Sequence, residues 1–332
     1  MEPSNNTQID VEQYYRMMAE VTAYFGRCLH TSSTAVTYLK DRGVQGRIAA
    51  QFGIGFAPSG LSELESILSR YDQKVADAAS LVVTDSNSGR KYARFRNRIM
   101  FPIKDCHGRI VGFGGRCLQP SDSLPKYINS QDSSFFHKGK LLYGLPASTS
   151  YQVTGDRLVV VEGYMDVISL VQAGYRSAVA VLGTACSANH VAKILSMDHR
   201  ITFCFDGDAA GRRAAARTLE VILPFLTDKT DVNFLFLPES HDPDSFVRSF
   251  GVDEFRRLTC DAVQAGTYLK DAIVGDYTLQ TIEDISQCLH RARPYWSKMT
   301  ACSAKQNLLN FCCSISGLDS HRLVSTWSSV VS

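Results

Sequence analysis

Acidic residues follow two short apolar segments of this 332-residue chain, at the points where the segments end. Residues 158–161 lead into Glu162, and residues 201–205 lead into Asp206 and Asp208. A short apolar run bounded by glycine is typical of a buried strand in a parallel sheet. Because ligands gather at the carboxyl ends of such strands, we expect these three carboxylates to meet at one edge of one sheet.

Three further acids extend this set. Asp166 follows Glu162 by one helical turn, and Asp242 and Asp244 flank a proline in a later acidic loop. Magnesium prefers oxygen ligands and usually keeps several waters while using only a few carboxylates. Phosphoryl transfer needs charge to be neutralised on the attacking and leaving oxygens, which one or two metal ions can do. So many acids at one sheet edge would repel one another unless cations were present.

Each acid also has a purely structural explanation. Asp208 can cap the helix that begins at Ala209, and Asp166 can favour the positive end of its own helix. Asp242 before a proline is an ordinary residue for a turn. The matching positions of the whole set at strand ends favour a metal-dependent active site over these separate explanations.

Positive charge is concentrated upstream of the acids. Residues 90–140 hold eleven Lys and Arg against three acids, whereas residues 151–255 hold nine against fourteen. Arg94, Arg96 and Arg98 alternate in a strand predicted over 92–103, so they should line one face of that strand. With aromatic neighbours and a Gly-Gly-Arg sequence that ends at Arg116, this pattern favours contact with a nucleic-acid backbone over a merely solvated surface.

The elements that must position these residues can be predicted from apolar periodicity. Alternation of strand and helix over residues 157–237 implies a parallel sheet with right-handed crossovers. We expect its strands at 158–161, 177–182, 200–205 and 232–237, and its helices at 164–173, 187–196 and 209–223. The chain before residue 150 is predicted to be α+β, with helices at 14–29, 33–42, 46–52 and 61–71. From residue 253 it is predicted to be mostly helical, with a break at Pro294.

Composition and missing motifs exclude several classes of protein. With 45% hydrophobic and 20% charged residues, the chain is an ordinary globular protein. It has no apolar run long enough to span a membrane and no signal peptide, so we expect a cytoplasmic location. Ten cysteines without a Cys-x-x-Cys pair predict neither disulfides nor zinc. Phosphate-loop, dinucleotide-binding and Ser or Cys nucleophile motifs are missing.

Several of these segments resemble bacterial DnaG-type primases. The resemblance to the Toprim domain of that family rests on Val161-Glu-Gly-Tyr-Met-Asp166, Leu182-Gly-Thr184, Phe205-Asp-Gly-Asp-Ala-Ala-Gly-Arg212 and Asp242-Pro-Asp244. The family's basic subdomain is matched by Arg94-Phe-Arg-Asn-Arg-Ile-Met-Phe-Pro-Ile103, Gly112-Phe-Gly-Gly-Arg116, Pro125-Lys-Tyr-Ile-Asn-Ser130 and Phe136-His-Lys-Gly139. Tyr38-Leu-Lys-Asp-Arg-Gly43 and the segment 52–58 fit as well. The likeness runs from about residue 14 to about residue 323 and is weak in the helical tail.

The resemblance implies an enzyme that makes RNA primers on a DNA template by metal-dependent nucleotidyl transfer from NTPs. It makes Glu162, Asp206 and Asp208 catalytic residues and metal ligands, with Asp166, Asp242 and Asp244 as further ligands. It implies that Mg²⁺ is the cofactor, with Mn²⁺ able to replace it. The residues that would contact the nucleotide or the template and primer strands are Arg116, Lys126, Tyr127 and Lys138, with Arg42, Arg94 and Arg96 as weaker candidates.

The resemblance also implies a division of the chain and a set of partners. We expect a flexible leader over 1–13, a basic α+β subdomain over 14–150, a Toprim subdomain over 151–252 and a helical subdomain over 253–332. The expected partners are a single-stranded DNA template, NTPs and the RNA primer, with a replicative helicase or a single-strand-binding protein as further candidates and no membrane. The family's zinc module and helicase-binding domain are not matched. We therefore expect either an excised core or a naturally short primase, such as one from a mobile element.

Two other classes of function stay open on the sequence. A Toprim nuclease or a topoisomerase-like enzyme would use the same carboxylates to cleave strands. A non-catalytic nucleic-acid-binding module could keep the fold without the reaction, and it predicts that Glu162→Gln changes nothing.

Overall fold

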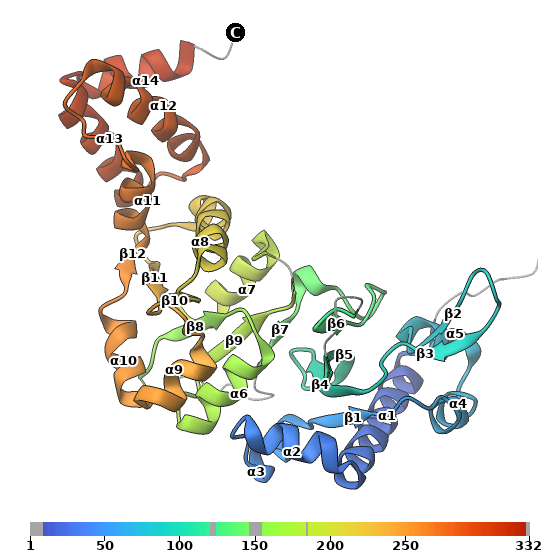
Figure 1. Ribbon diagram of the computed structural model, residues 1–332. Coiled ribbons are helices and arrows are strands. Elements are labelled where there is room, and N and C mark those ends of the chain that lie inside the picture. Colours follow the sequence, from blue (N-terminus) through green and yellow to red (C-terminus); the bar gives the residue numbers. More distant parts are fainter. Residues whose placement is uncertain (1–8, 120–123, 146–154, 184, 330–332) are drawn as a thin grey trace, which may run out of the picture. The chain divides into compact units, whose positions relative to one another are not determined.

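The computed structural model describes residues 9–119, 124–145, 155–183 and 185–329 (Figure 1). The chain divides into two compact units. The first unit holds residues 1–153, 163–174 and 179–184, and the second holds residues 154–162, 175–178 and 185–332. Residues 1–8 of the predicted leader lie outside the described residues, and the four-part division proposed from the sequence stays a prediction.

The first unit is a mixture of short helices and antiparallel strands. Its helices are α1 (Val11–Thr31), α2 (Ser33–Asp41), α3 (Gly46–Phe52), α4 (Ser62–Leu68), α5 (Gln73–Ala79), α6 (Tyr164–Ala173) and the 3-10 helix η1 (Lys138–Lys140). Its strands are β1 (Gly55–Ala57), β2 (Val82–Thr84), β3 (Lys91–Ala93), β4 (Arg98–Lys104), β5 (Ile110–Cys117), β6 (Tyr127–Asn129) and β7 (Leu142–Tyr143). Strands β1, β4, β5 and β6 form one sheet in that order, and β2 pairs with β3 in a separate hairpin.

Helix α1 packs its apolar side against the sheet of the first unit. Asp10 caps the helix by accepting from the Gln13 amide at 3.0 Å. The buried Tyr14 donates its hydroxyl to the Val111 carbonyl of β5 at 2.9 Å. A Cβ on Gly55 would lie 2.6 Å from Phe25 Cβ, so only glycine lets β1 lie this close to α1. These contacts make the sheet and α1 one apolar core.

The predicted continuous strand over 92–103 is wrong. The structure has β3 up to Ala93 and β4 from Arg98, with a bend between them in which Asn97 adopts φ +52°. A left-handed residue turns the chain and ends the alternation of side chains. Arg94, Arg96 and Arg98 therefore have three different environments and do not line one strand face.

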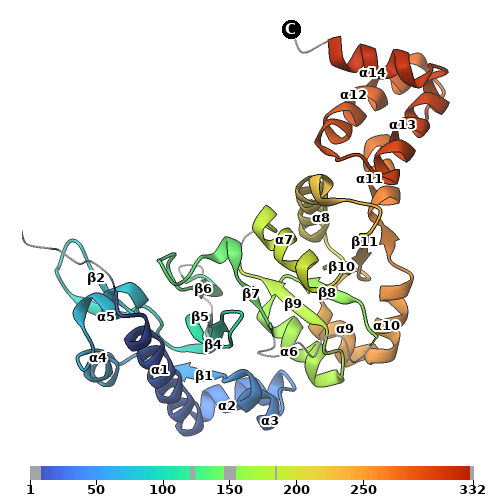
Figure 2. The ribbon, with the colours of Figure 1, turned by 180° about the vertical axis from the view of Figure 1, so that it is seen from behind.

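The second unit contains a sheet covered by helices on both faces. Its strands include β8 (Leu158–Val161), β10 (Arg200–Phe205), β11 (Asp231–Phe236) and β12 (Val263–Gln264), ordered β12-β11-β10-β8. Strands β8, β10 and β11 are parallel, and β12 is antiparallel to β11. Helices α7 (Ala188–Met197) and α8 (Ala209–Ile222), with η3 (Leu223–Phe225) after α8, cover one face, and α9 (Pro243–Phe250) and α10 (Val252–Cys260) cover the other (Figures 1 and 2).

The strand and helix predictions for this region are confirmed to within one or two residues, as is the mixed α/β fold class. Strand β9 (Ala178–Val181) spans the division between the units, and its later part pairs antiparallel with β7 in the first unit. Apolar runs such as residues 158–161 are fully buried, which is why periodicity identified them so well.

The chain ends in a helical region, as predicted. It contains α11 (Ala265–Val274), α12 (Ile282–Lys298), α13 (Ser303–Ser316) and α14 (Ser320–Ser329). The predicted break at Pro294 is wrong, because this proline lies inside α12. A proline removes one helical hydrogen bond, and burial of Cys288 and Ala292 in the helix packing outweighs that loss.

None of the described helices has the length and apolar character needed to cross a membrane. Every cysteine is in the free thiol form, and five are buried, namely Cys117, Cys186, Cys204, Cys288 and Cys312. The two exposed thiols are Cys106 and Cys260.

Candidate active site

Acidic residues follow the carboxyl ends of two neighbouring parallel strands in the second unit. The β8–β10 register pairs Val160 with Phe203, so two residues further Glu162 stands level with Phe205 and beside Asp206. Glu162 and Asp208 are exposed, and Asp206 is half-buried. The sequence prediction that strand ends would bring Glu162, Asp206 and Asp208 to one edge agrees with this register.

The pKa of Glu162 shows that the carboxylates at this edge repel one another. Partial desolvation by the surrounding protein raises the pKa of Glu162, and the neighbouring Asp208 carboxylate raises it further. Arg217 on α8 acts in the opposite direction and lowers it. Although its side chain is accessible, Glu162 thus holds its negative charge less readily than an ordinary glutamate, because it is partly desolvated and a like charge lies nearby.

Glycines fix the loop that carries Asp206 and Asp208. A Cβ on Gly207 would lie 2.2 Å from the Pro238 carbonyl oxygen, and one on Gly211 would lie 2.2 Å from the Asp206 carbonyl oxygen. The Gly207 amide donates to the His241 carbonyl at 3.2 Å. The loop after β10 is therefore held against the segment after β11, which leads directly to α9.

Two of the acids also have the structural roles that were considered as alternatives. Asp208 caps α8 by accepting from the Gly211 amide at 2.8 Å, and Asp242 caps α9 by accepting from the Ser245 amide at 2.7 Å. Asp244 is only 1% exposed and accepts from Arg248 Nε at 2.9 Å. One capping bond uses one carboxylate oxygen, so a cap and a metal ligand are compatible roles for Asp208 and Asp242.

Asp166 belongs to the first unit. It is buried in the first turn of α6, where a negative side chain is favoured by the helix dipole. A Cβ on Gly163 would lie 2.6 Å from its Oδ2 atom. Glycine at position 163 is thus required for the Asp166 carboxylate to occupy this place.

The donor set of the acidic edge suits a divalent cation. Within the part of the chain that the structure describes, no three acidic, His or Cys side chains are gathered closely enough to hold a metal ion by themselves. Magnesium needs only one or two carboxylates and completes its shell with water. The mutual repulsion of Glu162 and Asp208 is what a cation there would relieve, so these oxygen donors are compatible with a divalent cation.

A second group of predicted residues surrounds Arg116 in the first unit. Arg116 and Tyr127 are direct cross-strand partners on β5 and β6. Arg116 Nη1 donates to the Tyr127 hydroxyl at 2.7 Å, and its guanidinium carbon lies 5.1 Å from the centre of the Tyr38 ring. Burial raises the pKa of Tyr127 to about 12, and Arg116 opposes that rise. Arg42 lies 5.9 Å from the same Tyr38 ring.

Arg94, Arg96 and Arg98, which lie in and next to the bend between β3 and β4, line a pocket in the first unit. Arg94 donates to the Asn129 carbonyl at 2.8 Å, and burial lowers its pKa. The Arg96 guanidinium stacks on the Tyr92 ring at 4.5 Å. Arg98 is buried and donates to the Gly115 carbonyl at 3.1 Å. All three contribute to a pocket of about 610 Å³, in which Arg98 acts as a structural residue.

Two predicted lysines have less defined environments. Lys126 is exposed just before β6, and the backbone amide of Lys138 donates to Asp132 Oδ1 at 3.1 Å. Sequence reasoning missed Tyr38 and Asn129 as site residues. The available signal for Tyr38 was its position four residues before Arg42 in a predicted helix, because such pairs share one helix face. Asn129 carried no such signal, and it accepts from the Tyr164 hydroxyl at 2.6 Å.

Two family models match the chain. They are the N-terminal domain of the DNA primase catalytic core over residues 24–149 and the Toprim domain over residues 156–236. The chain is 41% identical over 310 residues to the DNA primase of Legionella pneumophila, an alignment that covers 93% of this chain and 53% of that protein. The chain spans about half the length of the curated relatives it matches.

Solved structures match over nearly their whole length. A DNA primase domain from Pseudomonas aeruginosa is 39% identical with a TM-score of 0.85, covering 94% of this chain and 98% of that one. A DnaG primase catalytic domain bound to single-stranded DNA is 34% identical with a TM-score of 0.85, again covering 94% and 98%. Identity at this level over the whole of such a domain, together with the acidic strand ends, shows that the chain belongs to the family of DnaG primase catalytic cores.

Proposed function

We propose that this chain synthesises RNA primers on a single-stranded DNA template, using NTPs as substrates. The observation that carries the proposal is the acidic edge of Glu162, Asp206 and Asp208 in a chain of the DnaG core family. A related catalytic domain is described as bound to single-stranded DNA, which supports the same kind of template here. Strand cleavage and binding without catalysis are not favoured, because the matches are to primases.

The proposed reaction is a nucleotidyl transfer. The 3′-hydroxyl oxygen of the primer forms a bond to the α-phosphorus of the NTP, the bond from that phosphorus to the α,β-bridging oxygen breaks, and pyrophosphate leaves. The hydroxyl proton must be accepted during this step, and a carboxylate with a raised pKa accepts protons more readily than an ordinary one. Glu162 is therefore the residue that we propose for this role.

The second unit's acids would also hold the cofactor. A divalent cation, for which we propose Mg²⁺ with Mn²⁺ able to replace it, would neutralise charge on the attacking oxygen and the departing pyrophosphate. Asp206 and Asp208 are the side chains proposed to bind it together with Glu162. The supporting roles of Asp166, Asp242 and Asp244 rest on the family resemblance. The prediction that a replicative helicase or a single-strand-binding protein is a partner also rests on the family resemblance.

The basic residues of the first unit would bind the polyanionic substrates. Arg116, Lys126, Tyr127 and Lys138, with Arg42, Arg94 and Arg96, are proposed to contact the NTP or the strands. Arginine suits this role because its planar fork of N–H donors matches phosphate oxygens.

Primer synthesis on single-stranded DNA tests the proposal directly. The assay uses labelled ribonucleotides with Mg²⁺ or Mn²⁺, once without a primer and once with an annealed primer. We expect short RNA from the parent and none from Asp206→Ala, while Asp253→Ala, which changes a carboxylate that is 96% exposed and paired with Arg256, keeps full synthesis. No RNA from the parent in either arm would refute the proposal that this chain acts as a primase on its own.

A further inference from the structure

Arg116 is a buried cation without an acidic partner. Arg116 is only 7% exposed. Among the described residues, its guanidinium forms no ion pair with a carboxylate. Its hydrogen bond within the described chain is the one from Nη1 to the Tyr127 hydroxyl. A buried charge is costly unless it is paired. Since guanidinium carries five N–H donors, Arg116 retains donor capacity for an anion supplied from outside.

Two aromatic rings define where this guanidinium lies. Its carbon is 5.1 Å from the centre of the Tyr38 ring and 5.3 Å from that of the Tyr127 ring. Tyr127 comes from the neighbouring strand, whereas Tyr38 comes from α2, nearly eighty residues earlier in the chain. Faces of aromatic rings attract cations at such distances. The two rings thus stabilise the Arg116 guanidinium in place of a carboxylate. Because the rings are uncharged, they do not neutralise its positive charge.

A second guanidinium approaches the same ring. Arg42 lies one turn after Tyr38 at the end of α2, and its guanidinium carbon is 5.9 Å from the centre of the Tyr38 ring. Two guanidinium groups therefore lie at one ring, and each carries planar N–H donors of the kind that bind oxyanions. Phosphate is the anion whose geometry matches arginine forks, and it is the group that NTPs and nucleic-acid strands share.

We propose that Tyr38 is a positioning residue that, with Tyr127, holds the Arg116 guanidinium ready to bind a phosphate group of the nucleotide or of a nucleic-acid strand. This inference rests on the proposed function for the identity of the ligand. Tyr38 acts through Arg116, so its ring matters and its hydroxyl does not. A rigid, already stacked arginine loses less conformational entropy on binding phosphate than a free side chain would.

The test compares Tyr38→Leu, which removes the ring, with Tyr38→Phe, which keeps it. The control is Tyr15→Leu, because Tyr15 lies under Arg109 at 4.1 Å elsewhere in the same unit. Four quantities are measured: KM and kcat for NTP in extension of an annealed primer, Kd for a fluorescein-labelled oligo-dT strand, and the melting temperature.

We expect Tyr38→Leu to raise KM for NTP, or Kd for the strand, by about tenfold with kcat within about twofold, as the loss of one cation–π contact predicts. Tyr38→Phe should stay within about twofold of the parent, as should Tyr15→Leu. A change in KM alone identifies a nucleotide phosphate as the ligand, and a change in Kd alone identifies a strand phosphate. The melting temperatures of Tyr38→Phe and the parent should agree.

Three results would overturn the inference: unchanged KM and Kd in Tyr38→Leu, equal defects in Tyr38→Phe and Tyr38→Leu, or an equal defect in Tyr15→Leu. If Tyr38→Leu does not fold, Tyr127→Phe takes its place, and it should weaken binding by about threefold because the acceptor for Nη1 is lost. If the parent makes no RNA, the proposed function fails, and binding of a fluorescent N-methylanthraniloyl ATP and of the oligo-dT strand still decides the role of Tyr38.

Discussion

At the scale of single residues, the negative charge of Glu162 lies in an environment that is unfavourable for the stability of the fold. Its pKa is raised first by desolvation and then by Asp208. A carboxylate whose folded-state pKa is raised loses stability as the pH rises from its ordinary value of 4.5 through the folded value. At neutral pH the metal-free protein therefore carries the whole of this penalty, which a bound cation would remove.

Substitution of Glu162 by Gln should separate activity from stability. We expect RNA synthesis to fall by at least about a hundredfold, because one charge that acts in the transition state is lost. In EDTA the melting temperature should stay equal or rise by about 1–2 °C, a small effect because Glu162 is solvent-accessible. Mg²⁺ should raise the melting temperature of the parent more than that of the variant.

The control for this pair of measurements is Glu220→Gln, which removes an exposed pair with Lys298. It should keep both synthesis and the response to Mg²⁺. A large fall in the melting temperature of Glu162→Gln in EDTA would show that Glu162 stabilises the fold, contrary to its environment in the structure.

At the scale of elements, the loop after β10 depends on two glycines because backbone atoms occupy the space beside them. The Pro238 carbonyl lies where a Cβ on Gly207 would be, and the Asp206 carbonyl lies where one on Gly211 would be. Neither neighbour is the flexible end of a side chain, so any added carbon must move the loop that carries Asp206 and Asp208.

We expect Gly207→Ala to reduce synthesis by more than about tenfold, because a displacement of about 1 Å in a catalytic group is costly. The free energy of unfolding should fall by about 1–3 kcal/mol from overpacking. Gly266→Ala in α11 is the matched control, since a Cβ there has nothing within 4 Å. Its stability should be equal or slightly higher, and its activity unchanged. Activity and stability are measured by primer extension and urea unfolding.

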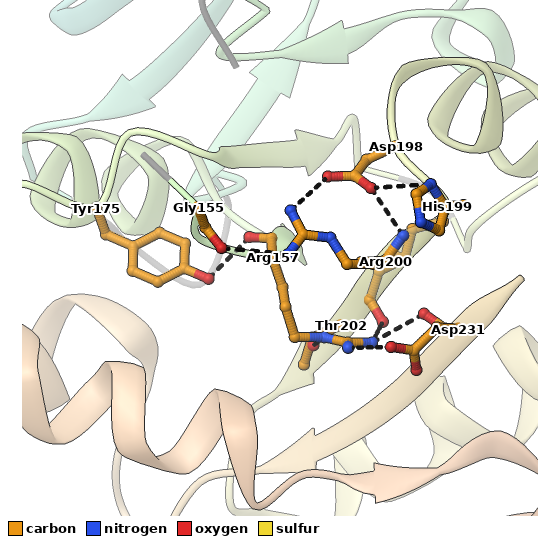
Figure 3. Close-up of polar contacts among 9 residues, drawn as sticks. Gly155, Arg157, Tyr175, Asp198, His199, Arg200, Thr202 and Asp231 are labelled. Atoms are coloured by element: carbon orange, nitrogen blue, oxygen red, sulfur yellow. Dashed lines mark hydrogen bonds and ion pairs between the residues drawn. The ribbon is translucent and has the colours of Figure 1, made fainter. Parts of the chain in front are cut away.

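The opposite, amino-terminal ends of the same strands are joined by Arg157 (Figure 3). Its Nε donates to Thr202 Oγ1 at 3.0 Å, and its Nη2 donates to the Ile201 and Asp231 carbonyls at 3.0 and 2.8 Å. Its Nη1 also forms an ion pair with the Asp231 carboxylate. Arg157 thus connects β8, β10 and β11, and it fixes the register that brings the acids level at the other ends.

Hydrogen bonding to Arg157 lowers the pKa of Asp231 below its ordinary value of 3.8. A lowered folded-state pKa gives stability that is present above the ordinary value and is lost as the pH falls through the folded value. Asp231→Asn should therefore cost about 1 kcal/mol at pH 7, a value reduced by solvent screening. The cost should shrink as urea unfolding is repeated at increasingly acid pH, and a cost that grows in acid would contradict this assignment.

At the scale of the whole molecule, the two units divide the charges. The first unit contains the basic segment 90–140, and the second contains most of the acidic segment 151–255. Such a division suits an enzyme that binds polyanions with one part and cations with another. The ionic part of strand binding should therefore come from the first unit.

Strand affinity should fall steeply with salt, because each neutralised phosphate of a single strand contributes about 0.7 to the slope of log Kd against log salt. Arg96→Gln should reduce that slope by about 0.7. Arg257→Gln is the control, because Arg257 already forms ion pairs with Glu254 and Asp261. The slopes are obtained from fluorescence anisotropy of a labelled oligo-dT strand, and an equal reduction in both variants would assign the effect to net charge alone.

The sequence by itself determined the local elements of the second unit and the acids at their ends. Burial repeats with a fixed period along a strand or helix, so a run such as residues 158–161 predicts its own structure. Strands joined by helical crossovers run parallel, so their carboxyl ends share one edge, and this places Glu162 and Asp206 at the same edge. These inferences need no knowledge of distant contacts.

Only the tertiary structure decided the surroundings of the basic residues. Arg94, Arg96 and Arg98 look equivalent in the sequence, but a left-handed residue at Asn97 gives them separate partners. Tyr38 of α2 lies 5.1 Å from the Arg116 guanidinium carbon of β5, a contact that no local pattern encodes. Pro294 stays inside a helix because burial of its neighbours outweighs one missing hydrogen bond. Periodicity reports which side of an element is buried, whereas the identity of the group that covers it depends on segments that meet only in the folded chain.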